Sequence, residues 1–255
     1  MLLGGLQKFT LIDYPGKLAC TVFAQGCDFR CPFCHNPELV IIDEKTPQIS
    51  EEEFFDFLQK RRGKLDGVCI NGGEPAIQSD LENFIQKIKD LGFLVKLDTN
   101  GARPDTLQKL IDQELIDYIA MDIKAPLGAN SQFLIPNSQK NDKSRKLSGQ
   151  ITKYEEAIGG VKIDIEKIKE SVFIIMNSPI EYEFRTTAVP GLHAEEDFIE
   201  IAKWLKGARV YYLQEYRDIK ILDENLKQKT TGKKLDLEKI RESIKDYFVF
   251  VGIRN

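Results

Sequence analysis

The chain has 255 residues, of which 42% are hydrophobic and 30% charged, and its net charge is −4. These values fit an ordinary globular protein, and we predict a single domain over residues 1–255. The negative charge does not favour nucleic-acid binding, so no nucleic-acid partner is expected. No apolar run approaches the ~18 residues of a membrane span, and residues 1–8 do not resemble a signal peptide, so a cytoplasmic location without membrane contact is expected.

Segments typical of strands and helices alternate along the chain. Apolar and β-branched runs predict strands at 17–25, 66–71, 93–98, 117–124, 182–189, 208–215 and 248–253. Caps and helical periodicity predict one helix that begins after Ser50 and one that Ser79 caps and that runs through Leu91. Further helices are predicted at 104–113, 164–176, 194–205 and 236–247. This alternation predicts an α/β fold, a partial (β/α)6 barrel similar to a TIM barrel, with parallel strands and outer helices.

One stretch, at about 128–152, interrupts the alternation with polar and basic residues. We interpret it as a loop insertion. It is either a tolerated surface segment or a basic contact for an acidic substrate or partner.

Three of the five cysteines lie together in the loop that follows the first predicted strand, with the spacing Cys-x3-Cys-x2-Cys: Cys27, Cys31 and Cys34. In a reducing compartment, clustered cysteines favour metal binding or redox chemistry over disulfides. Iron–sulfur clusters are held by thiolates, commonly four, so three ligands suggest a cluster with one open iron. Zinc is the alternative, although a fourth ligand is not evident. Cys20 and Cys69 fall inside strands and are expected to be buried as small apolar residues.

Polar residues also follow the next strands. Gly72-Gly73-Glu74-Pro75, Asp98-Thr99-Asn100-Gly101 and Met121-Asp122-Ile123-Lys124 each end a strand, and Arg185 lies inside an apolar one. Alone, these stretches are turns or solvated strand ends. Because the carboxyl ends of barrel strands meet at one face, we expect them to share a pocket with the cysteine loop. His193 fits no such pattern and is predicted to be a surface turn residue.

The cysteine spacing after the first barrel strand resembles the radical S-adenosylmethionine enzymes. The resemblance implies that Cys27, Cys31 and Cys34 bind three irons of a [4Fe–4S] cluster, and that the open iron chelates S-adenosylmethionine. Reductive cleavage of this cofactor then gives a 5′-deoxyadenosyl radical that abstracts a hydrogen atom. The family's Gly-Gly-Glu motif, here Gly72, Gly73 and Glu74, would receive the cofactor's amino group, and Phe33 would lie near its adenine.

Within this superfamily the chain resembles the glycyl-radical-enzyme activases. Their shared elements are Gln25-Gly26-Cys27, Cys34-His35-Asn36, Asp98-Thr99-Asn100-Gly101 and the Asp122 to Lys124 segment. The resemblance implies that the cofactor pocket also includes His35, Asp98, Thr99, Asp122, Lys124 and Arg185. In the pyruvate formate-lyase type the Asp-Thr pair helps bind a monovalent cation. That type has Pro-Tyr-His near its last cofactor contact, where this chain has Gln214-Glu215-Tyr216.

The leading hypothesis is a radical S-adenosylmethionine activase. It would form a glycyl radical on a protein partner, with flavodoxin or ferredoxin as electron donor. Residues 5–17, 182–187 and 212–216 resemble the activating proteins of anaerobic ribonucleoside-triphosphate reductase. The alternatives are a radical enzyme for a small molecule, similar to 7-carboxy-7-deazaguanine synthases, and a non-enzymatic zinc-binding module.

Overall fold

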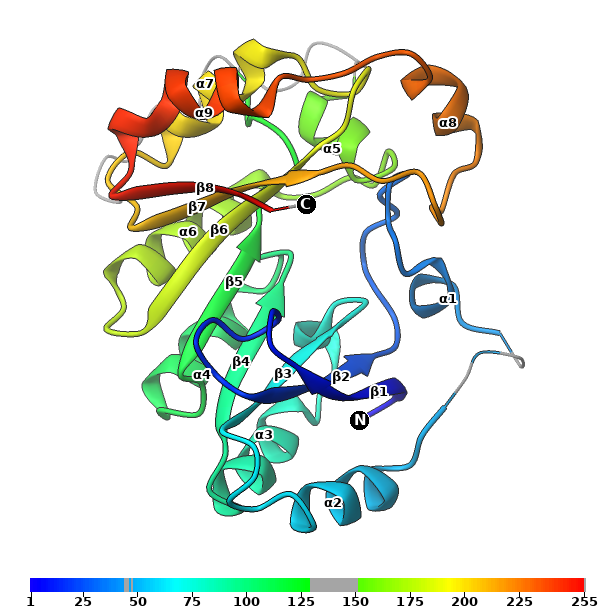
Figure 1. Ribbon diagram of the computed structural model, residues 1–255, viewed down its shortest axis with the longest axis vertical. Helices are drawn as coiled ribbons and strands as arrows, with labels where there is room; N and C mark the ends of the chain where they lie inside the picture. Colours follow the sequence, from blue (N-terminus) through cyan, green and yellow to red (C-terminus); the bar gives the residue numbers. More distant parts are fainter. Residues whose placement is uncertain (44–45, 47, 129–150, 255) are drawn as a thin grey trace.

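The computed structural model describes residues 1–43, 46, 48–128 and 151–254. In this part of the chain eight strands form one curved sheet in sequence order (Figure 1). β1 pairs with β2 in antiparallel fashion, and every later strand pairs in parallel with the one before it. The strands are β1 (Leu3–Thr10), β2 (Ala19–Ala24), β3 (Gly67–Gly72), β4 (Leu94–Thr99), β5 (Tyr118–Asp122), β6 (Glu181–Ala188), β7 (Val210–Glu215) and β8 (Phe250–Arg254).

The sheet does not close, because its edge strands β1 and β8 do not pair with each other. The predicted partial barrel with parallel strands and outer helices is therefore confirmed. β1 was not predicted. It carries two glycines and exposes Gln7, Lys8 and Phe9, so it lacks the continuous apolar run of the central strands.

Helices cover the outer side of the sheet, with α2, α3 and α4 beside its first half and α6, α7 and α9 beside its second (Figure 1). Ser50 caps α2 as predicted, since its hydroxyl accepts a hydrogen bond from the Glu53 amide. α3 begins after Asp80, one residue later than predicted. The helices are α1 (Pro37–Val40), α2 (Glu51–Gln59), α3 (Leu81–Asp90), α4 (Pro104–Asp112), α5 (Lys153–Ala157), α6 (Ile165–Asn177), α7 (Glu195–Trp204), α8 (Asn225–Thr230) and α9 (Leu237–Ile244).

Each long helix buries one apolar face against the sheet. In α3 this face is formed by Leu81, Phe84, Ile85 and Ile88, which recur at helical spacing. The opposite, inner face of the sheet carries the polar strand ends. The apolar core therefore lies between the sheet and the outer helices, and the inner face is available for a binding site.

The predicted insertion at about 128–152 falls almost entirely on residues 129–150, which lie outside the described residues. Where the description resumes, Thr152 caps α5 through a capping box with Glu155. No helix in the described ranges combines the length and the apolar character needed to cross a membrane.

Candidate functional site

One cavity of about 590 Å³ opens on the inner face of the sheet, at the carboxyl ends of the strands. Its wall includes the three clustered cysteines and residues from β3 to β8. Every predicted site residue except Glu74 lines it: Cys27, Cys31, Phe33, Cys34, His35, Gly72, Gly73, Asp98, Thr99, Asp122, Lys124 and Arg185. The structure thus brings together motifs that are up to 158 residues apart in the sequence, from Cys27 to Arg185.

The cysteine loop is held against the end of β3 by the main chain. The Glu74 amide donates to the Gly26 carbonyl at 2.7 Å, and the Gly73 amide donates to the Ala24 carbonyl at 2.9 Å. A Cβ atom on Gly73 would lie only 1.9 Å from the Gly26 carbonyl oxygen, so glycine is required for this close approach. The close approach of Gly73 to Gly26 therefore places the backbone after β3 directly beside Cys27.

The three thiols of the cysteine loop are buried or half-buried, and all three line the cavity. Burial raises the pKa of Cys27 to about 12 and that of Cys31 to about 11, so both thiols are protonated until a metal displaces the proton. Among the described residues, no three His, Cys, Asp or Glu side chains converge on one metal position. The Phe29 amide also points at the Cys27 sulfur, at 3.4 Å.

Glu74 lies behind the cavity wall, in contrast to the position that the motif implies. Its side chain is 1% exposed and accepts hydrogen bonds from the Thr99 hydroxyl at 2.8 Å and the Asn100 amide at 2.6 Å. Burial raises the pKa of Glu74 to about 7, against the opposing effect of these hydrogen bonds. In the described structure Glu74 thus positions the turn after β4, and Gly72 and Gly73 form the wall.

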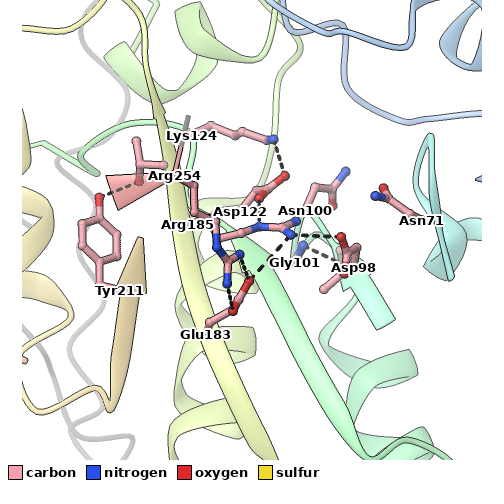
Figure 2. Close-up of polar contacts among 12 residues, drawn as sticks. Asn71, Asp98, Asn100, Gly101, Asp122, Lys124, Glu183, Arg185, Tyr211 and Arg254 are labelled. Carbon is pink, nitrogen blue, oxygen red and sulfur yellow. Dashed lines mark hydrogen bonds and ion pairs between the residues drawn. The ribbon is translucent and has the colours of Figure 1, made fainter. Parts of the chain in front are cut away.

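A buried charge network continues the wall from β4 to β6 (Figure 2). Lys96 pairs with one carboxylate oxygen of Asp98, and Arg185 donates to the other at 3.0 Å. Burial alone would raise the pKa of Asp98, but these two cations hold that pKa below its ordinary value. Asp98 is therefore a fixed anion, with a protein cation on each of its oxygens.

Asp122 and Lys124 extend the network along β5. Arg185 donates to Asp122 at 2.8 Å, and Lys124 donates to its other oxygen at 2.9 Å. Burial opposes the charges of Asp122 and Lys124. Even so, the ion pairs lower the pKa of Asp122 and raise the pKa of Lys124. Both side chains stay charged over the ordinary pH range, and Lys124 presents a cation beside the cysteine loop.

The prediction that His193 is a surface residue is wrong. Its ring is 5% exposed, and its Nδ1 accepts a hydrogen bond from the Val189 amide at 3.0 Å. Its Nε2 therefore carries the proton and donates to the Lys124 carbonyl at 2.9 Å. His193 ties the turn after β6 to the end of β5. The sequence did not indicate this, because the burial of a turn depends on what packs over it.

Phe33 and His35 of the cysteine loop differ in how they are held. Phe33 is buried and makes an edge contact with His193 at 6.4 Å between ring centroids, while Lys124 Nζ lies 5.9 Å from its centroid. His35 is exposed, stacks on Tyr216 at 6.4 Å, and contacts the Arg217 carbonyl at 2.8 Å. Both line the cavity, but only Phe33 is held by the core.

Some wall residues were not assigned from the sequence. Ile12 and Asp13 come from the connection between β1 and β2, and Thr187, Gln214 and Arg254 come from the ends of β6, β7 and β8. Glu183 lies below them, fully buried, and accepts hydrogen bonds from Arg254 at 2.5 and 2.8 Å. The sequence could have indicated Glu183 as a partner of the site, because it stands two residues before Arg185 in an apolar strand and therefore lies on the same face.

Comparison with known proteins agrees with this geometry. The family profile described as the radical SAM superfamily matches residues 21–205. A Methanocaldococcus jannaschii protein named for glycyl-radical enzyme activation is 33% identical over 256 residues, which cover 99% of this chain and 95% of that protein. The pyruvate formate-lyase-activating enzyme of Staphylococcus aureus is 33% identical over 132 residues, 48% of this chain and 52% of that enzyme.

Solved structures agree at the level of the fold. Streptococcus suis SuiB bound to S-adenosylmethionine superposes with a TM-score of 0.61 at 14% identity over 91% of this chain. The chain spans about half the length of SuiB, since the match covers 49% of it. The chain therefore belongs to the radical SAM superfamily, whose enzymes use a [4Fe–4S] cluster with S-adenosylmethionine, and to its glycyl-radical-enzyme activase group.

Proposed function

We propose that this enzyme forms a glycyl radical on a protein partner, anaerobic ribonucleoside-triphosphate reductase. When bound, the cluster and S-adenosylmethionine supply the radical that abstracts a hydrogen atom from the target glycine. In this proposal Cys27, Cys31 and Cys34 hold the cluster. Flavodoxin or ferredoxin supplies the electron.

The observation that carries the proposal is that one cavity joins the cysteine loop to the ends of β6, β7 and β8. In this proposal a radical generated beside the cysteines meets a substrate held against these last strands within the same cavity. Because β1 and β8 do not pair with each other in the described part of the chain, the sheet stays open, and in this proposal a loop of the partner enters between these two edges. Ile12 lies at this cavity with 80% of its surface exposed, as expected for a contact with a protein.

The chain's own residues have separable tasks in this proposal. The backbone of Gly72 and Gly73 and the aromatic ring of Phe33 contact the cofactor. Lys124 has a fixed positive charge and provides a partner for the cofactor's carboxylate. Asp98, Thr99, Asp122, Arg185 and His35 complete the cofactor pocket, and Glu74 acts through Thr99 as a positioning residue.

Two observations support the proposal at different levels: the first supports activation of a glycyl radical enzyme, and the second supports the choice of reductase. The M. jannaschii relative carries the name of a glycyl-radical enzyme activating enzyme and matches almost the whole chain. Residues 5–17, 182–187 and 212–216 resemble the activating proteins of anaerobic reductases. All three segments contribute wall residues: 5–17 contributes Ile12 and Asp13, 182–187 contributes Arg185 and Thr187, and 212–216 contributes Gln214.

The test is electron paramagnetic resonance of the reconstituted enzyme mixed with the reductase, reductant and S-adenosylmethionine under anaerobic conditions. The expected result is the doublet of a glycyl radical on the reductase. Cofactor cleavage without a radical on the reductase would contradict the proposal. Consumption of a small molecule with stoichiometric 5′-deoxyadenosine would favour the small-molecule alternative instead.

A further inference from the structure

Three residues form a polar row across the last strands of the sheet. Thr187 of β6 pairs in register with Gln214 of β7, and Gln214 pairs with Arg254 of β8. Paired residues project to the same face, and all three line the cavity. Because neighbouring strands lie ~4.8 Å apart, the row spans about 10 Å, which is the length of about three residues of extended peptide.

Arg254 is held rigidly at the end of this row. Gly252 has no side chain, and a Cβ there would lie 2.6 Å from the Tyr212 ring, so the ring occupies that space. The Arg254 guanidinium lies 3.5 Å from the centroid of the Tyr212 ring. Its two terminal nitrogens donate to Glu183, as Figure 2 shows. Since Glu183 is fully buried, this carboxylate both orients the guanidinium and matches its charge.

The other two members of the row are free to bind. Within the described residues, neither the Thr187 hydroxyl nor the Gln214 amide hydrogen-bonds to another residue. Each can donate and accept a hydrogen bond. The positive charge of Arg254 is balanced by the buried Glu183 carboxylate, so the row does not select for an acidic ligand. It suits neutral groups that alternate donors and acceptors, which is the chemistry of a peptide backbone.

We infer that the polar row binds main-chain peptide groups of the partner segment that carries the target glycine. This inference rests on the proposed function and adds the substrate subsite. Glycine has no side chain, so polar contacts to the glycine itself are contacts to its backbone groups. The row lies at the far end of the sheet from the cysteine loop, which leaves the middle of the cavity for the cofactor and the reacting carbon.

The experiment uses Thr187→Val, Gln214→Leu and the double variant, which remove hydrogen-bonding groups with little change in volume. Gln59→Leu on the exposed face of α2 is the matched control. The probe is a short synthetic peptide copied from the glycine loop of anaerobic ribonucleoside-triphosphate reductase. Its binding to enzyme that holds the cluster and S-adenosylmethionine is measured by calorimetry without reductant, so no turnover is needed.

We expect each single variant to weaken peptide binding about 3- to 10-fold, the double variant by roughly the product, and Gln59→Leu to have no effect. Reductive cofactor cleavage without peptide should be unchanged in all variants, which also shows that they fold. Variants that bind the peptide as tightly as the wild type would overturn the inference.

Two further outcomes would also overturn the inference. One is loss of cofactor cleavage without peptide, because the row would then contact the cofactor. The other is failure of the wild-type enzyme to bind the peptide. If binding depends on the row but the intact reductase gains no radical, the inference holds and the proposed function fails.

Discussion

The two halves of the cavity wall are built in different ways. On the cysteine side, the wall consists of short contiguous stretches at the ends of β2 to β5, and hydrogen bonds between neighbouring stretches help to fix them. On the side of β6 to β8, Thr187, Gln214 and Arg254 come from distant parts of the sequence and meet only through strand register. In our proposal the first side generates the radical and the second selects the substrate, so variants on each side should fail in different assays.

The largest effect is expected from Cys34→Ala on the cysteine side. The variant removes one of three cluster ligands, so the enzyme should lose reductive cofactor cleavage and bind fewer than the about four irons of a complete cluster. Iron analysis and quantification of 5′-deoxyadenosine after anaerobic reconstitution measure this. Cys20→Ala is the control, since Cys20 is buried within β2 away from the cavity. Full cleavage activity in Cys34→Ala would refute the ligand assignment.

Arg185→Met tests how much the buried ion pairs contribute to stability in comparison with an exposed ion pair. It removes a cation from both Asp98 and Asp122, although Lys96 and Lys124 remain beside them. We expect a loss in the free energy of unfolding near the lower end of the about 3–5 kcal/mol seen when a buried pair is broken. Urea unfolding measures this. Lys109→Met, which breaks the exposed pair with Glu82, should cost less than about 1 kcal/mol. Equal losses in the two variants would contradict the assigned roles.

Glu74→Gln should weaken the turn after β4 by about 1–3 kcal/mol, because it places an amide N–H where the site requires an acceptor. The cost should also depend on pH. The pKa of Glu74 rises from 4.5 to about 7 on folding, so its stabilising contribution is complete below 4.5 and declines as pH rises towards 7. The difference in unfolding free energy between wild type and variant should therefore narrow between about pH 5 and 7. A difference that widens with pH would show that Glu74 is ionised in the folded protein.

The smallest effect is expected from Ile12→Ser, in the exposed connection between β1 and β2. Loss of an apolar contact with the partner should raise the KM for the reductase by roughly 5-fold, equivalent to about 1 kcal/mol. Cofactor cleavage without the partner should not change. Ile219→Ser is a matched control, because Ile219 is also 80% exposed but does not line the cavity. Weaker binding of S-adenosylmethionine to Ile12→Ser would instead mean that Ile12 covers the cofactor.

The difference between the two sides also explains what the sequence could predict. The cysteines and the polar strand ends lie in short stretches with fixed spacing, and strand alternation was enough to bring them to one face. The direction of the Glu74 side chain could not be predicted. It depends on the positive φ of Gly72 and on hydrogen-bond donors at the end of β4. The row of Thr187, Gln214 and Arg254 needs the register of three strands, which periodicity does not fix.

The central claim is that a radical formed beside the cysteines reaches a glycine held against the last strands. Deuterium transfer tests it most directly. A reductase carrying deuterated glycine at its target position is mixed with the reconstituted enzyme, reductant and S-adenosylmethionine, and the 5′-deoxyadenosine is analysed by mass spectrometry. The account predicts one deuterium in the product together with a glycyl radical on the reductase. Unlabelled 5′-deoxyadenosine formed alongside that radical would contradict direct abstraction in this cavity.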